Sequence, residues 1–163
     1  MAPRYDVGII NPFLDAVVGV LGMMASVEVT PGKPYINRKR SAVGDVTGTI
    51  GISGTAEGVM SLTLDEAVIL KVVNNMLAEN YTEINDEIAD AVGELTNMIA
   101  GQARQDLVKQ GMTLKASTPT VIIGKGHNIS HITSSPILSI PFTTSEGSLV
   151  VEVSFDSTEP EDS

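Results

Sequence analysis

The stretch INDEIADAVGELTNMIAGQARQDLVKQ, residues 84–110, decides the fold that we expect for this chain. At about 100° per residue, the turn of an α-helix, its apolar residues fall on one narrow stripe. The stripe, which we predict to be buried, consists of Ile88, Val92, Leu95 and Ile99. This regular spacing predicts a long helix that packs against the rest of the protein along one side.

The opposite side of this helix collects polar and small residues: Asp90, Glu94, Asn97, Gly101 and Arg104. Glu94 and Asn97 are then neighbours one turn apart. An exposed Asn is unfavourable in mid-helix, and Gly101 costs about 1 kcal/mol relative to Ala. The stripe is either a solvated surface or a docking face. In a docking face, Gly101 would leave room for a partner, while Glu94 would offer a charge and Asn97 an amide.

Composition limits the class of protein. The 163 residues, 42% of them apolar, predict one domain over residues 1–155, followed by a short acidic, disordered tail over 156–163. Ten basic and twenty acidic residues give a net charge of -10, which disfavours nucleic acid and anionic membranes as partners. The N-terminal 24 residues interrupt their apolar run with Asp6, Pro12 and Asp15, so we expect neither a signal peptide nor a membrane span. The expected location is cytoplasmic.

Periodicity and turn residues predict the remaining elements. In chain order we expect a helix over 10–24, a strand over 27–30, a hairpin over 42–64 with its turn at 54–58, a helix over 65–77, a strand over 120–123 and a hairpin over 137–155. The first helix is apolar nearly all round, which predicts burial on most sides. Asp65 is expected to cap the helix over 65–77. The inner stripe of that helix would be Ala67, Leu70, Val73 and Leu77.

Three further patterns offer weaker indications of a site. The glycines between 44 and 58 lie within strands and no Gly-Lys-Ser/Thr follows, so we reject a phosphate loop. His127 and His131 lie in a predicted polar loop over 124–136 without a third ligand, so we expect no metal. The basic run Arg38-Lys39-Arg40 is either a solvated loop or a contact for an acidic partner.

The chain contains a weak internal repeat. GISGTAEGVMSLTL, residues 51–64, and PFTTSEGSLVVEVSF, residues 141–155, each place Glu-Gly in a turn before an alternating strand, downstream of a long helix. Aligning Asp15 with Asp90 places Gly19 opposite Glu94 and Gly22 opposite Asn97. If the polar pair is a site, the chain therefore has one.

The segment Asp90-x-x-x-Glu94-x-x-Asn97, within GELTNMIAG and followed by Pro119, resembles the signature of the CheC/CheX/FliY family of bacterial chemotaxis phosphatases. The resemblance extends over nearly the whole chain. A single Glu-x-x-Asn pair makes the chain most similar to CheX, the one-site member. The fold implied is a two-layer α/β (α+β) sandwich, in which two long helices cover an antiparallel or mixed sheet with an internal pseudo-repeat.

The resemblance also implies an activity: hydrolysis of the phosphoaspartate of a CheY-like response regulator. Asn97 would orient the attacking water, Glu94 would pair with a lysine of the receiver domain, and Asp90, Gly101 and Arg104 would border the docking face. The receiver would supply the Mg²⁺, with no cofactor held by this chain. A homodimer formed through sheet edges is likewise implied. Two other classes stay open: a receiver-binding adaptor without catalysis, and a structural domain whose polar helix face is merely solvated.

Overall fold

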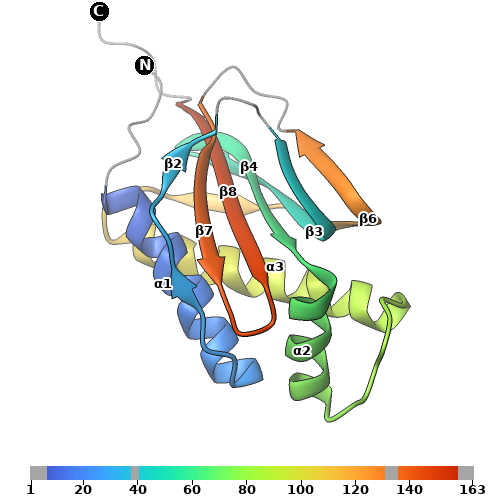
Figure 1. Cartoon of the computed structure of the whole chain (residues 1–163). Helices are drawn as coiled ribbons and strands as arrows, with labels where there is room; N and C mark the ends of the chain where they lie inside the picture. Colours follow the sequence, from blue (N-terminus) through green and yellow to red (C-terminus); the bar gives the residue numbers. More distant parts are fainter. Residues whose placement is uncertain (1–6, 38–40, 131–135, 158–163) are drawn as a thin grey trace, which may run out of the picture.

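One antiparallel sheet of eight strands carries three helices, which confirms the predicted two-layer α+β sandwich (Figure 1). The computed structural model describes residues 7–37, 41–130 and 136–157. The helices are α1 (Val7–Ala25), α2 (Glu66–Leu77) and α3 (Asp86–Val108). The strands are β1 (Thr30–Pro31), β2 (Tyr35–Ile36), β3 (Ser41–Gly54), β4 (Ala56–Leu64), β5 (Leu114–Ala116), β6 (Thr120–Ser130), β7 (Leu138–Thr143) and β8 (Ser148–Ser157).

The sheet topology confirms the internal repeat of helix and hairpin, although Glu57 and Gly58 lie within β4 and not in the predicted turn over 54–58. The strand order is β1-β7-β8-β4-β3-β5, with β2 also pairing with β7 and β6 with β3. Each half of the chain therefore has a long helix, two arm strands and a hairpin, and α2 is an insertion between the halves. The arm strands of each half pair with the hairpin of the other half, and the hairpins meet at β4 and β8. Each half of the chain therefore contributes strands to the part of the sheet that is built on the hairpin of the other half.

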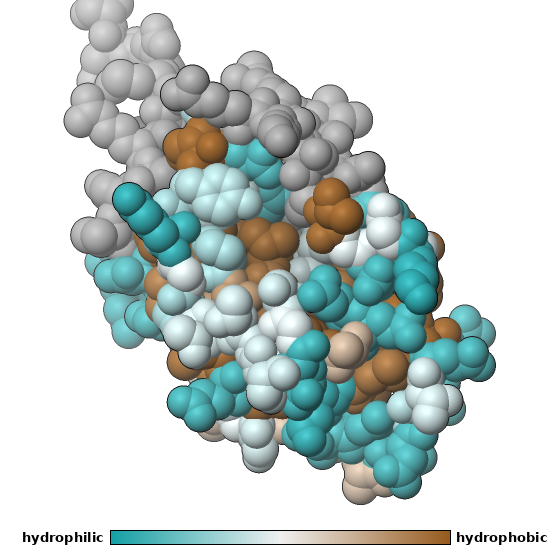
Figure 2. Space-filling model, in the orientation of Figure 1, coloured by the Kyte–Doolittle hydropathy of each residue, from teal (hydrophilic) through white to brown (hydrophobic). Residues whose placement is uncertain are grey.

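The two faces of the sheet differ in polarity because side chains alternate along each strand. Leu62, Val151 and Phe155 belong to the buried apolar core, and Phe13 of α1 lies with its ring centroid 6.1 Å from that of Phe155. On the opposite face, Glu152 is buried and accepts hydrogen bonds from Ser139 Oγ at 2.7 Å and Asn37 Nδ2 at 2.9 Å. Figure 2 shows polar surface with scattered apolar residues on this side of the molecule. The helices accordingly pack on the apolar face.

Helix α1 is buried on one side only, so the prediction of burial on most sides is wrong. Phe13, Val17 and Leu21 are fully buried, whereas Asn11 and Asp15 are exposed. Residues Gly8–Ala25 are long and apolar enough to cross a membrane by length and composition alone, and 39% of them are buried within the protein. The difference arises because the other side of α1 exposes Val18, Met23 and Met24 together with Gly19 and Gly22.

The predicted stripe of α2 is correct for Val73, and Leu70 is partly buried against the core, but the other two residues of the stripe are wrong. Its buried residues are Val68, Ile69, Val72 and Val73, while Ala67 and Leu77 are exposed. The buried residues are spaced i, i+1, i+4 and i+5, which is itself a helical stripe, rotated from the predicted one.

The start of α2 is held by carboxylates from two elements. Asp65 occupies the N-cap position without capping through its side chain. Its Oδ2 instead accepts from the backbone N–H of Ser148 on β8 at 2.9 Å. Asp45 on β3 takes over the capping role, because its Oδ2 accepts from the N–H of Glu66 at 2.8 Å. The predicted cap is therefore supplied by the neighbouring strand.

Strand β6 is longer than the sequence suggests. The predicted strand over 120–123 continues to Ser130, so residues 124–130 of the predicted polar loop are a strand. Gly126 donates its N–H to Asp45 Oδ1 at 3.0 Å, and His127 Nε2 lies 2.8 Å from Thr47 Oγ1. These contacts with β3 hold a polar segment in the sheet that its own composition would leave in a loop.

Smaller differences concern the arms and the ends. The predicted strand over 27–30 is replaced by β1 and β2, each two residues long. Strand β8 continues to Ser157, two residues into the predicted tail. Arg38-Lys39-Arg40, His131 and the rest of the tail lie outside the described residues.

Candidate active site on the central helix

Helix α3 is the rigid support of the candidate site. Asn85 caps it, because its Oδ1 accepts from the N–H of Ile88 at 2.9 Å, and Asp86 and Glu87 place negative charge at its positive end. The whole predicted stripe, Ile88, Val92, Leu95 and Ile99, is fully buried. This confirms which side of α3 faces the core, and hence which side faces outward.

A close contact sets the distance between α3 and the sheet. Thr96 is buried, and its Oγ1 donates to Val92 O at 2.7 Å. A methyl group added to Gly48 of β3 would lie 2.0 Å from Thr96 Oγ1. Only glycine therefore leaves room for the helix at this distance. Because Thr96 precedes Asn97, the contact also sets the height of the polar pair above the sheet.

The polar pair lines an open hollow beside α3. Asp90, Glu94 and Asn97 are exposed, and together with Ala89, Gly93, Pro119 and Val121 they surround about 450 Å³. Within the described part of the chain, neither Glu94 nor Asn97 has a hydrogen bond to another side chain or to the backbone of another element. Both side chains are therefore available to a molecule that approaches from outside.

The side of the hollow opposite α3 is formed by Pro119 and by Val121 of β6. A methyl group added to Gly93 would lie 3.5 Å from Val121 Cγ2 and 3.9 Å from Pro119 Cγ. Pro119 thus reaches the site, as its place in the sequence signature suggested, whereas Val121 was not anticipated. Side chains alternate between the two faces of a strand, and this alternation along β6 could have indicated Val121. Val121 pairs with Gly48 and points toward α3.

The remaining predicted site residues, Gly101 and Arg104, follow Asn97 along α3. Gly101 has no atom within 4 Å of an added methyl group, so contacts within the described residues do not require glycine there. Arg104 is half-buried, and its Nε donates to Leu114 O on β5 at 3.1 Å. Arg104 therefore also ties α3 to β5, a structural role that the periodicity of the helix does not reveal.

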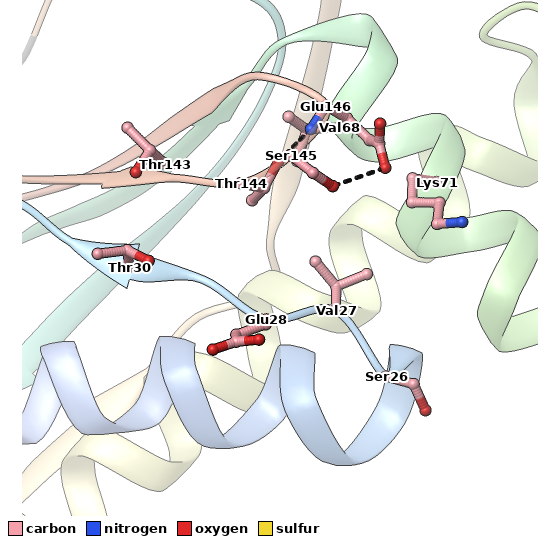
Figure 3. Close-up of a pocket in the computed structure, with 10 residues that line it drawn as sticks. All are labelled: Ser26, Val27, Glu28, Thr30, Val68, Lys71, Thr143, Thr144, Ser145 and Glu146. Carbon is pink, nitrogen blue, oxygen red and sulfur yellow. Dashed lines mark hydrogen bonds between the residues drawn. The ribbon is translucent and has the colours of Figure 1, made fainter.

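A second cavity lies elsewhere. It encloses about 580 Å³ between the segment after α1, helix α2 and the β7–β8 turn (Figure 3). Its charged residues are Glu28, Lys71 and Glu146, and Ser145 Oγ donates to Glu146 Oε1 at 2.9 Å. It contains none of the predicted site residues.

Charged groups near the sheet edge act structurally. The backbone N–H groups of Glu66 and Gly126 hold the pKa of Asp45 below its usual value. His127 lies between Thr47 and Gly124 O, with its Nδ1 2.6 Å from that oxygen. Within residues 7–37, 41–130 and 136–157, no group of three or more His, Cys, Asp or Glu residues is placed to hold a metal ion.

An exposed carboxylate and carboxamide on a rigid helix define a surface site, one suited to a partner macromolecule. The model of the family described as chemotaxis phosphatase CheX matches residues 46–143, more than half of the chain and including the site. This chain belongs to that family.

Individual relatives agree with this assignment. The CheY-P phosphatase CheX of Thermotoga maritima is 27% identical over 139 residues, 85% of this chain and 88% of the relative. The chemotaxis protein CheX of Desulfovibrio desulfuricans has a crystal structure with 43% identity and a TM-score of 0.87, covering 91% of this chain and 99% of that one. A Borrelia burgdorferi structure of CheX with CheY, BeF3 and Mg²⁺ has 27% identity and a TM-score of 0.76, covering 94% and 100%.

Proposed function

We propose that this protein hydrolyses the phosphoaspartate of a CheY-like response regulator in the cytoplasm, and that Asn97 and Glu94 are the residues that do so. The observation that carries the proposal is the placement of these two side chains. They are exposed and without hydrogen-bond partners among the described residues, on a helix whose other side is fully buried. The names of two relatives support the choice of partner, a CheY-P phosphatase and a complex of CheX with CheY.

Asn97 would act on the attacking water. A carboxamide accepts a hydrogen bond through its oxygen and donates through its nitrogen, so it can hold water in one orientation without changing its own protonation. The water oxygen would attack phosphorus in line with the bond to the aspartate oxygen. That bond breaks, leaving a free aspartate and inorganic phosphate, which takes up the proton of the water. Holding the water in line is the contribution that the chemistry needs.

Glu94 would fix the position of the partner. A carboxylate pairs with a lysine ammonium by a charge-assisted hydrogen bond, and such a pair sets the register of two docking surfaces. Asp90 precedes the pair and Gly101 follows it on the same side of α3, and Arg104 is the last residue of this polar stripe. The receiver would contribute the Mg²⁺ that neutralises the phosphoryl oxygens, so no step needs a metal held by this chain.

The roles are separated by two substitutions. With a phosphorylated CheY-type receiver, Asn97→Ala should lower kcat by about 100-fold or more, the loss typical of removing one positioned polar group, with little change in binding. Glu94→Ala should chiefly raise KM. Asn80→Ala removes an exposed carboxamide away from the site and is the matched control. The assay is release of inorganic phosphate, corrected for the decay of the receiver alone.

The same assay tests the other two classes. If the native protein binds the phosphorylated receiver without accelerating its decay, the protein is an adaptor. If replacement of Glu94 and Asn97 together, by Lys and Ala, alters neither binding nor turnover, the polar face is only solvated. Either result would overturn the assignment of a catalytic pair.

We also propose that the protein forms a homodimer through a sheet edge. Strand β6 pairs with β3 on one side, and its Ile122 and Ile123 are partly exposed. An edge strand of this length presents unpaired backbone groups that a second sheet can satisfy. Sedimentation of the native protein and of Ile123→Lys would test this, since the charged variant should sediment as a monomer.

A further inference from the structure

A second groove lies on the other flank of α3, along its seam with α1. It encloses about 360 Å³ and is lined chiefly by Met23 and Met24 of α1, Met98 of α3, and the carboxylates Asp15 and Asp106. Gln110 Nε2 donates to Gly8 O at 2.7 Å, so the C-terminus of α3 lies beside the N-terminus of α1 and the helices run antiparallel. The methionines therefore gather at one end of the groove and the two aspartates at the other.

The methionine end adjoins the candidate active site. Met98 directly follows Asn97 in α3, so its side chain lies about 100° round the helix from the amide. Asn97 thus stands on a ridge between two hollows, with Pro119 and Val121 on one flank and the methionines on the other. A molecule that covers Asn97 can enter this groove without leaving the surface of α3.

The methionines are unusually open for apolar residues. Met23 is 86% exposed and Met24 45% exposed, and they extend from a helix whose other residues supply the core. Methionine is flexible and polarizable, which suits a surface that adapts to the shape of a partner. Water at these side chains is released when a partner covers them, so the groove offers binding free energy that the monomer does not use.

We propose that this methionine groove is the second half of the receiver docking surface, an inference that rests on the proposed function. The groove would take an apolar segment of the receiver next to the phosphoaspartate, and Asp15 would pair with a basic residue beyond it. Asp106 already shares an exposed ion pair with Lys109 at 3.7 Å, so Asp15 is the acidic residue that stays open to a partner.

Area and charge favour the receiver as the occupant. A specific complex buries about 800 Å² on each partner, which two polar side chains cannot supply. The groove is an apolar surface continuous with them, on the flank of α3 opposite Pro119 and Val121. A net charge of -10 selects a partner whose contact face is basic near the acidic end. From Asn97 to Asp106 the helix advances by nine residues, so the basic residue should lie on the order of 14 Å from the phosphoaspartate.

The test compares binding with turnover. Gln keeps the length and helix propensity of Met, so Met23→Gln/Met24→Gln removes apolar contact and leaves the helix intact. The variant should bind a CheY-type receiver loaded with beryllofluoride and Mg²⁺ about tenfold more weakly, because two apolar side chains lose their burial. Its KM should rise by a similar factor, with kcat unchanged. Leu77→Gln, on the exposed side of α2, should leave both values within about twofold.

Asp15→Asn tests the charged end. It should raise Kd by about threefold at low salt and flatten the dependence of Kd on salt, since one charge pair is lost. Kd is measured with the beryllofluoride-loaded receiver, which is not hydrolysed, so that binding is read without turnover. Thermal unfolding of each variant confirms that it folds.

The outcomes separate the two proposals. If the native protein hydrolyses the receiver phosphate and Met23→Gln/Met24→Gln retains native Kd and KM, the groove is not a docking site and the proposed function stands. If binding weakens as expected but the native protein shows no turnover, the groove is confirmed as a docking site and the proposed phosphatase activity is rejected. If the variant changes from dimer to monomer with an unchanged Kd for the receiver, a second copy of the chain occupies the groove and the inference is overturned. Absence of any receiver binding overturns both.

Discussion

Gly48→Ala should push α3 away from the sheet and so disturb both stability and the site. The added methyl group would lie 2.0 Å from Thr96 Oγ1 and 3.0 Å from Thr96 Cβ. Strand β3 cannot retreat sideways, because Gly48 is paired with Leu62 on one side and Val121 on the other. Thr96 is β-branched and buried, and turning its hydroxyl away breaks the bond to Val92 O.

The expected magnitude combines two opposing effects. Overpacking in a well-packed interior costs about 1–3 kcal/mol, and replacing glycine within a strand returns about 0.5–1 kcal/mol of chain entropy. The free energy of unfolding should therefore fall by about 1 kcal/mol and by no more than about 2.5 kcal/mol, and in a domain of this size each kcal/mol lowers Tm by about 2–4 °C. Phosphatase turnover should fall as well, because Asn97 follows the displaced Thr96.

Urea unfolding of a double-mutant cycle measures the effect. In a Thr96→Ala background the hydroxyl is gone, so Gly48→Ala should cost at least about 1 kcal/mol less than in the native chain. Gly51→Ala, on the same strand, adds a methyl group 3.1 Å from Oγ of the exposed Ser117 and is the control, whose smaller cost should be the same in both backgrounds because it does not involve Thr96. An equal cost of Gly48→Ala in both backgrounds would show that the Thr96 contact does not set the position of α3.

Two further predictions use the same methods. Gly101→Ala and Gly22→Ala both add a methyl group into open space on an exposed helix face, so each should raise stability by up to about 1 kcal/mol. Gly101→Ala should also raise KM for the receiver; an unchanged KM would remove Gly101 from the docking face. Asp45→Asn should be destabilising at neutral pH. The folded-state pKa of Asp45 lies below its usual 3.8, so its contribution is present above that value and is lost as the pH falls through the folded pKa. Urea unfolding from pH 7 to pH 2 should show native and Asp45→Asn proteins converging in acid; a constant difference would contradict this.

Local periodicity was sufficient to predict which side of α3 is exposed, because one stretch of sequence contains both sides of the helix; the interpretation of the exposed side as a site came from the family resemblance. The buried stripe identifies the inner side, so the positions of Glu94 and Asn97 on the outer side follow from helix geometry alone. The wall at Val121 and the spacing set by Gly48 depend on strands far away in the chain. No pattern within α3 indicates them.

The same limit explains the wrong cap predicted for α2 and the underestimated length of β6. Both elements are held by Asp45, which accepts from Glu66 at the start of one and from Gly126 in the other. A single carboxylate on β3 thus sets the start of a helix and keeps a polar segment in the sheet. Neither effect is visible in the composition of the segment concerned, because each is a contact between residues at least 21 positions apart.

The two halves of the repeat share an architecture and divide the work of the proposed site. With Asp15 aligned to Asp90, α1 presents Gly19 and Gly22 where α3 presents Glu94 and Asn97, and nothing lies within 4 Å of a methyl group added to either glycine. The first helix has therefore kept an open ridge without the groups needed to hold water or a lysine. Its methionines instead line the groove beside the amide of the second helix. A single helix face that carries the proposed catalytic pair, beside an apolar groove, would bind one receiver along both helices.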